Sequence, residues 1–124
     1  MLSTSKTTLV LGASPKSERF SNEAIRELQN YDIPVIALGK RDSDLGYIRI
    51  RKGMPQDISE VHTISLYLSA KNQKEYYDYI FSLNPTRIIF NPGTYNSELI
   101  SMALKRRIKV VNDCTVLMLN KGIF

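Results

Sequence analysis

Five short apolar runs alternate with amphipathic segments along this chain of 124 residues, and this alternation restricts the fold more than any other feature. The runs cover residues 7–11, 35–38, 62–68, 87–90 and 108–111. Continuous apolar runs are typical of strands that are buried on both faces, and helices between such strands make them parallel. We therefore predict one α/β domain over residues 1–124, with a parallel five-stranded sheet in the order 3-2-1-4-5 and helices on both faces.

The segments between the runs have the spacing of helices that dock on a sheet. Residues 22–31 and 73–83 are two such segments, each with apolar side chains on one face. Asn96 can cap a third helix, and a short fourth helix ends near Leu119. The expected apolar face of the third helix consists of Leu99, Ile100, Ala103 and Leu104.

This pattern is Rossmann-like, and in such sheets ligands bind beyond the carboxyl ends of the strands, beside strand one. The turns that gather there begin at Gly12, Gly39, Ser69 and Asn91. From residue 39 to residue 60 no period dominates, although alternation at 47–51 allows a short edge strand.

The first of these turns, Gly12-Ala13-Ser14, joins a strand to a helix N-terminus, an arrangement that points backbone N–H groups at an anion. Ser14 would add a hydroxyl, and Lys16 and Arg19 would add charge-assisted hydrogen bonds. The dinucleotide-binding glycine fingerprint is incomplete, because serine stands at positions 14 and 17. The alternative is a tight turn that only needs Gly12. We favour a phosphate site because the turn, the helix start and the cations coincide.

The second turn carries Gly39, Lys40 and Arg41, where NAD-binding domains usually place an acidic residue for the ribose hydroxyls. Two cations cannot accept hydrogen bonds from a diol, but they suit a phosphate on the ribose. NADP, with a 2′-phosphate, and coenzyme A, with a 3′-phosphate, both meet that demand. An exposed loop without a ligand explains the same pair equally well.

A catalytic group is not evident. His62 falls at the start of the third run, away from the ligand turns, so we expect a structural or surface role for it. Asp42 and Asp44 have no partner base, and packing is the favoured role of Cys114, the only cysteine. One cysteine excludes an intrachain disulfide, and we expect no metal site. The tyrosines at positions 76, 77 and 79 lie in a predicted helix and are expected to be core and surface residues.

Composition limits the other function classes. The net charge is +5, but the basic residues are spread along the chain and no nucleic-acid motif accompanies them, so nucleic acid is not the expected partner. No apolar run approaches the roughly 20 residues that span a membrane, and residues 1–6 are too short and polar for a signal peptide. We expect a cytoplasmic protein without a membrane partner. The apolar segment 116–124 could extend an interface with a protein partner or a second copy.

Four pieces of the sequence together resemble the CoA-binding domain family, in its small stand-alone branch, which is similar to the CoA-binding domain of the succinyl-CoA synthetase alpha subunit. The resemblance covers Thr7 to Leu119, and its specificity lies in the order and spacing of the pieces. They are Gly12-Ala13-Ser14 with Arg19-Phe20-Ser21-Asn22, Leu66-Tyr67-Leu68, Asn91-Pro92-Gly93, and Asn112-Asp113-Cys114-Thr115.

The resemblance implies a Rossmann fold that holds the adenosine diphosphate portion of CoA across strands one, two and three. By position, Ala13, Ser14 and Arg19 would meet the pyrophosphate, and Lys40 the adenosine and its phosphate. Residues 68–70 would flank the cofactor, and residues 91–93 would close the site. The chain departs from the family where Gly39-Lys40 replaces a common Asn-Pro. The candidate cofactor-binding residues are therefore Gly12, Ala13, Ser14, Lys16, Arg19, Phe20, Ser21, Gly39, Lys40, Arg41, Leu68, Ser69, Asn91, Pro92 and Gly93.

The synthetase relatives work through a phosphorylated histidine on another domain, and this chain has no histidine in a corresponding place. We therefore expect a non-catalytic module that binds CoA or a short acyl-CoA. One alternative is an NADP-binding reductase or a CoA-dependent transferase subunit that a partner chain completes. Another is a regulatory subunit whose pocket is vestigial.

Overall fold

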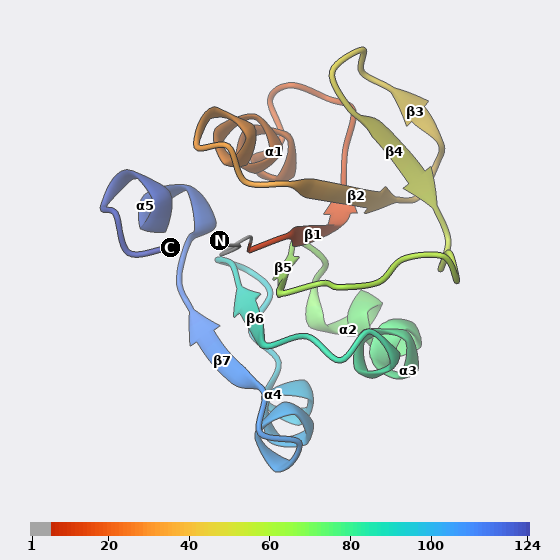
Figure 1. Cartoon of the computed structure of the whole chain (residues 1–124). Helices are drawn as coiled ribbons and strands as arrows, with labels where there is room; N and C mark the ends of the chain where they lie inside the picture. Colours follow the sequence, from red (N-terminus) through yellow and green to blue (C-terminus); the bar gives the residue numbers. More distant parts are fainter. Residues whose placement is uncertain (1–5) are drawn as a thin grey trace.

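A twisted, mostly parallel sheet forms the centre of the computed structural model, which describes residues 6–124 (Figure 1). The seven strands in this part of the chain lie in the order β3-β4-β2-β1-β5-β6-β7, and only β3 is antiparallel to its neighbour. The strands are β1 (Thr8–Ala13), β2 (Val35–Gly39), β3 (Ser43–Asp44), β4 (Arg49–Lys52), β5 (Thr63–Leu66), β6 (Arg87–Phe90) and β7 (Lys109–Asn112).

The predicted strand order requires a correction. The third apolar run, which contains β5, was expected beyond β2, but β5 pairs with β1, with Leu9 opposite Ile64. The position beyond β2 belongs to β4, where Ile50 lies opposite Ala37. The alternation at 47–51 thus marks a real strand, but β3 and not β4 forms the sheet edge. The five predicted runs therefore become seven strands, since the loop after β2 contributes two.

Side chains alternate across β1 and divide the core into two layers, as the pleat of a strand requires. Leu9 and Leu11 point into one layer, and Val10 points into the other. All three are almost completely buried, which explains why the first apolar run shows no polar alternation.

Helices cover both faces of the sheet (Figure 1). Ile25 of α1 and Leu119 of α5 pack in the layer that contains Val10, and the two helices lie side by side. Ile80 of α3 and Leu99 of α4 pack in the other layer. The helices are α1 (Phe20–Asn30), α2 (Ala70–Gln73), the 3₁₀ turn η1 (Lys74–Tyr76), α3 (Tyr77–Ser82), α4 (Ser97–Lys105) and α5 (Thr115–Asn120).

Three helix predictions differ in detail from the structure. The helix expected from residue 22 begins at Phe20, and the helix expected over 73–83 is three short elements that begin at Ala70. Asn96 caps α4 as predicted, since its Oδ1 accepts a hydrogen bond from the Leu99 N–H at 3.1 Å. Leu104, however, is 58% exposed and not part of the core, because the buried face of α4 follows Leu99 and Ala103, and Leu104 is turned away from that face.

Within residues 6–124, no helix has the length and apolar character needed to cross a membrane. The prediction that residues 1–6 do not form a signal peptide falls on a segment of which residues 1–5 lie outside the described residues.

Candidate ligand site at the carboxyl ends of the strands

The four predicted ligand turns lie at one end of the sheet, because β1, β2, β5 and β6 run parallel. We call this end the carboxyl edge and define it as residues 12–19, 39–41, 66–69 and 91–94. Sequence reasoning placed these turns together, and the topology confirms that arrangement. Contact with a ligand stays a prediction for all fifteen candidate residues.

The loop after β1 is held in place by side chains of α1. Ser14 N–H donates to Ser21 Oγ at 3.1 Å, and Asn22 Nδ2 donates to Ser14 O at 3.0 Å. Arg26 Nη2 adds a bond to Ser17 O at 2.9 Å. Ser21 and Asn22 are 4% and 2% exposed, so both are anchors of the loop. The loop therefore keeps its shape through contacts within the chain.

The N-terminus of α1 has the partial positive charge of a helix start and no side-chain cap, although Glu23 lies in its first turn and exposed Glu18 precedes it. Arg19 is its N-cap residue and makes no capping bond through its side chain. The N–H groups of Phe20 and Ser21 fall in the first turn, where a helix supplies no acceptor. Exposed Lys16 and Arg19 add charge beside them. Helix ends of this kind attract anions.

Two glycines let the backbone segments of the carboxyl edge approach closely. A Cβ at Gly12, which has φ of +98°, would lie 3.0 Å from the Tyr67 carbonyl carbon and 3.1 Å from Leu68 Cγ. A Cβ at Gly39 would lie only 2.3 Å from Ala13 O. No larger residue fits at Gly39 without movement of backbone. Close packing alone therefore explains why glycine stands at positions 12 and 39, without any contact with a ligand.

The second turn offers two exposed cations whose neighbouring carboxylates are engaged elsewhere. Asp42 Oδ1 accepts the Lys52 N–H at 3.0 Å. Asp44 accepts the Gly46 N–H at 2.9 Å and pairs with Arg49 at 3.5 Å. Lys40 and Arg41, in contrast, form no ion pair with any residue in 6–124. Their charge is therefore available to an external anion.

Gln73 joins two turns of the carboxyl edge to the cap of α4 and is completely buried. Its Nε2 donates to Leu68 O at 2.8 Å and to Thr94 O at 2.7 Å, and its Oε1 accepts from Asn96 Nδ2 at 2.9 Å. The turn after β5, the turn after β6 and the cap of α4 are thereby connected. Sequence reasoning missed this residue, because a glutamine near a helix start is usually exposed.

Asn91 has a similar structural role beneath α5. Its Nδ2 donates to Ser65 Oγ at 2.9 Å and to Leu66 O at 2.8 Å, while its Oδ1 accepts the Thr115 N–H at 2.8 Å. Burial raises the pKa of the neighbouring Tyr67 to about 12, although hydrogen bonds with Thr115 and Ser65 act to lower it. The phenol therefore stays neutral, and this cluster adds no charge to the site.

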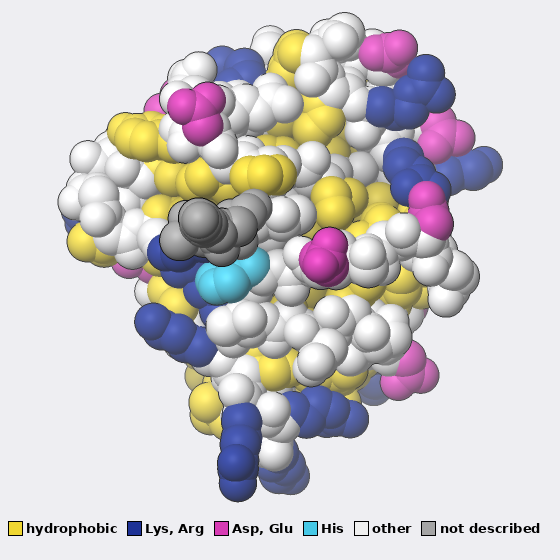
Figure 2. Space-filling view, in the orientation of Figure 1, with side chains coloured by type: hydrophobic (Ala, Val, Ile, Leu, Met, Phe, Trp, Pro, Cys, Tyr) yellow, Lys and Arg dark blue, Asp and Glu magenta, His cyan; other side chains and the backbone are white. Residues whose placement is uncertain are grey.

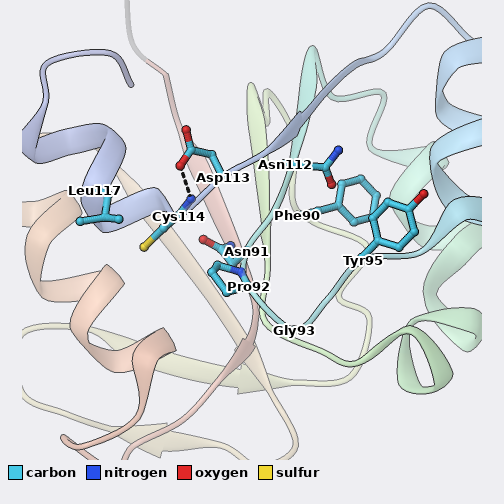
Figure 3. A pocket seen from close by; sticks show the side chains of 9 residues that line it. All are labelled: Phe90, Asn91, Pro92, Gly93, Tyr95, Asn112, Asp113, Cys114 and Leu117. Atoms are coloured by element: carbon cyan, nitrogen blue, oxygen red, sulfur yellow. Dashed lines mark hydrogen bonds between the residues drawn. The ribbon is translucent and has the colours of Figure 1, made fainter.

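The turn that Asn91 begins also borders a hollow of about 550 Å³ at the ends of β6 and β7 (Figure 3). The rings of Phe90 and Tyr95 lie on one side of it, and Cys114 and Leu117 lie on the other. Sequence reasoning foresaw Pro92 and Gly93 here but missed Tyr95 and Leu117, which come from separate elements. The complete lining is Phe90, Asn91, Pro92, Gly93, Tyr95, Asn112, Asp113, Cys114 and Leu117.

The opposite end of the sheet, which we call the amino edge, collects the basic residues Lys6, His62, Arg87 and Lys109. Figure 2 shows the histidine next to Lys or Arg side chains. Arg87 is 5% exposed, donates from Nε to Thr63 Oγ1 at 2.7 Å, and stacks 4.2 Å from the Phe124 ring centre. Burial, then the charges of Arg87 and Lys6, lower the pKa of His62. Its position away from the ligand turns agrees with the sequence prediction.

Within residues 6–124, no three His, Cys, Asp or Glu side chains gather closely enough to hold a metal ion.

Comparison with solved structures agrees with this architecture. The chain is 37% identical to an uncharacterized protein of known crystal structure, with 98% of this chain and 100% of that chain covered and a TM-score of 0.92. It is 22% identical to a hypothetical protein from Pyrococcus horikoshii OT3, with 95% and 84% covered and a TM-score of 0.85. It is 19% identical to a Thermus thermophilus protein, with 97% and 91% covered and a TM-score of 0.81. The last two similarities support the fold alone.

No curated protein matches the chain. A family model does: the model described as CoA binding domain aligns with residues 6–120, which includes every turn of the carboxyl edge. The sequence resemblance is thereby confirmed, and the chain belongs to the CoA binding domain family.

Proposed function

We propose that this protein binds coenzyme A at the carboxyl edge, with the diphosphate at the N-terminus of α1 and the 3′-phosphate beside Lys40 and Arg41. The observation that carries the proposal is the pair of unengaged cations after β2, whose adjacent carboxylates are bound to other groups. A nucleotide with an extra ribose phosphate supplies the charge that this turn lacks. Family membership supports CoA as that nucleotide.

The diphosphate part of the proposal rests on the loop after β1. Ser14, Lys16 and Arg19 lie beside an uncapped helix end, and the loop is already fixed by Ser21 and Asn22. A fixed loop loses little conformational entropy when a ligand binds, so its few charged contacts can contribute fully to affinity. We propose that the chain acts as a binding module and that any chemistry on the bound ligand requires a partner chain.

The decisive experiment is a calorimetric titration that compares CoA with dephospho-CoA on the wild-type protein and on a Lys40→Ala/Arg41→Ala variant. Charged hydrogen bonds contribute about 1.5–3 kcal/mol each, so the variant should bind CoA at least about tenfold more weakly. Both proteins should bind dephospho-CoA equally, because that ligand lacks the group that the cations contact. Lys105→Ala removes an exposed charge at the far end of α4 and serves as the control.

Three outcomes separate the alternatives. A lack of response to CoA at millimolar concentration would overturn the proposal. Tighter binding of NADP than of CoA would support the reductase alternative. If the variant lost affinity for CoA and for dephospho-CoA by the same factor, Lys40 and Arg41 would contact another part of the ligand.

A further inference from the structure

We infer that the hollow at the ends of β6 and β7 receives the acyl group of an acyl-CoA, and that it selects neutral apolar acyl groups over free CoA and over acyl groups that carry a carboxylate. This inference rests on the proposed function, because it assumes that the nucleotide end of the ligand binds at the N-terminus of α1. It adds the class of ligand that the site prefers.

The first argument is the distance along the sheet. Neighbouring strands lie about 4.8 Å apart, and β6 and β7 are the second and third strands from β1 on that side. The hollow therefore lies about 10–14 Å from the end of β1. The pantetheine arm of CoA has about twelve chain atoms, the length of a four-residue peptide backbone, and spans up to about 14 Å. Its thiol end would thus reach the hollow.

The second argument is continuity between the two positions. Gly12 lies against Leu68, and Gln73 joins Leu68 to Thr94 at the turn that borders the hollow. On this face of the sheet, α1 also packs beside α5, the helix that supplies Leu117 to the hollow. An extended arm can follow this row of turns from the helix end to the hollow.

The third argument is the chemistry of the lining. Tyr95 and Leu117 are 67% and 49% exposed and both border the same hollow, so their side chains are accessible to a ligand there. With Cys114, and with the edge of the almost completely buried Phe90, they place apolar groups on two sides of one space (Figure 3). The lining contains no lysine or arginine, and its only charged group is the Asp113 carboxylate. The Asp113 carboxylate would repel an acyl group that carries a carboxylate of its own.

The test is a calorimetric comparison of CoA, hexanoyl-CoA and succinyl-CoA on the wild-type protein. Hexanoyl-CoA should bind at least about tenfold more tightly than CoA, because its chain leaves water for the hollow. Succinyl-CoA should bind more weakly than hexanoyl-CoA by a still larger factor. Equal affinities for CoA and hexanoyl-CoA would overturn the inference and leave the proposed function intact.

Two variants link the preference to the hollow. Leu117→Asp and Tyr95→Ser should each lower the ratio of hexanoyl-CoA affinity to CoA affinity toward one. Leu104→Asp is the matched control, since Leu104 is similarly exposed but lies on α4, outside the hollow, and this change should leave the ratio unaltered. A ratio that Leu117→Asp does not change would overturn the inference. Failure of every CoA species to bind would overturn the proposed function, and the inference with it.

Discussion

The two ends of the sheet use polar residues in opposite ways. At the carboxyl edge, neutral amides of Gln73 and Asn91 form hydrogen bonds with backbone, and the cations Lys40 and Arg41 stand exposed without carboxylate partners. At the amino edge, the cation Arg87 is buried and covered by the ring of Phe124. Positive charge thus occurs at both ends, but at the amino edge the central cation, Arg87, is buried, whereas Lys40 and Arg41 at the carboxyl edge are both exposed beside an open turn.

The comparison teaches that charge alone does not identify a ligand site in this protein. Burial lowers the pKa of Lys6 and of His62, and the charge of Arg87 lowers both further. The Lys6 ammonium and the Arg87 guanidinium both donate to Phe124 O, at 2.6 Å and 3.2 Å. These cations are therefore engaged with the chain itself.

The largest effect is expected from a substitution that prevents the close approach of β1 and β2 at the carboxyl edge. Gly39→Ala places a Cβ only 2.3 Å from Ala13 O, so the backbone must move. We expect a loss of about 3 kcal/mol or more in the free energy of unfolding, measured by urea denaturation. Gly53→Ala is the control: its Cβ meets nothing within 4 Å, and its positive φ of +79° alone should cost about 1 kcal/mol. Equal losses in the two variants would contradict the packing explanation.

The next effect concerns the amino edge. Arg87→Ala should lower the free energy of unfolding by about 2–4 kcal/mol, because it removes the bond to Thr63 Oγ1 and the stacking on Phe124 and leaves a cavity. Arg87→Met keeps an apolar stem and removes a buried charge whose Nη2 has no partner among the described residues, so its cost should stay within about 1 kcal/mol.

The same two variants test the contrast between the edges. Neither should change the affinity for CoA, measured by calorimetry, because Arg87 lies at the end of β6 opposite the proposed site. A loss of CoA affinity in Arg87→Met, with stability retained, would show that the amino edge takes part in binding.

The smallest effect is a pH dependence at the amino edge. The pKa of His62 is lowered below its ordinary value of 6.5, so the unfolded chain binds this proton more readily than the folded protein does. Stability from this group is complete above pH 6.5 and is lost as the pH falls through the lower folded pKa. Below pH 6.5, the free energy of unfolding should fall further in the wild-type protein than in His62→Gln, by up to about 1 kcal/mol. Urea denaturation at a series of pH values measures this difference. Parallel pH profiles for the two proteins would refute this prediction.

The sequence predicted the parallel sheet and its ligand turns because apolar runs and turn residues are local signals. It could not predict the strand order: β4 contains a single fully buried residue, Ile50, among cations, and local periodicity does not say which neighbour a strand pairs with. The prediction therefore placed β5 beside β2, where the structure has β4. Leu104 was assigned to the core because helical spacing allows a wide apolar face and does not show where its boundary lies; the structure buries Leu99 and Ala103 and exposes Leu104.

The candidate site was predicted in part, for related reasons. Glycines, cations and the Asn-Pro-Gly turn are visible in the sequence. The bonds of Gln73 and the burial of Arg87 are not, because each depends on contacts between residues far apart in the chain, and both residue types are usually exposed. The hollow escaped prediction in the same way, since Tyr95 and Leu117 belong to different elements.

The buried amide of Gln73 also has a consequence for rates of association. Because it connects the turns after β5 and β6 with the cap of α4, these parts are assembled before any ligand arrives. A ligand at the carboxyl edge would therefore meet a preformed surface, and no folding of these loops would have to precede or follow the encounter. Differences in affinity among ligands of this site should then lie mainly in how quickly each one leaves.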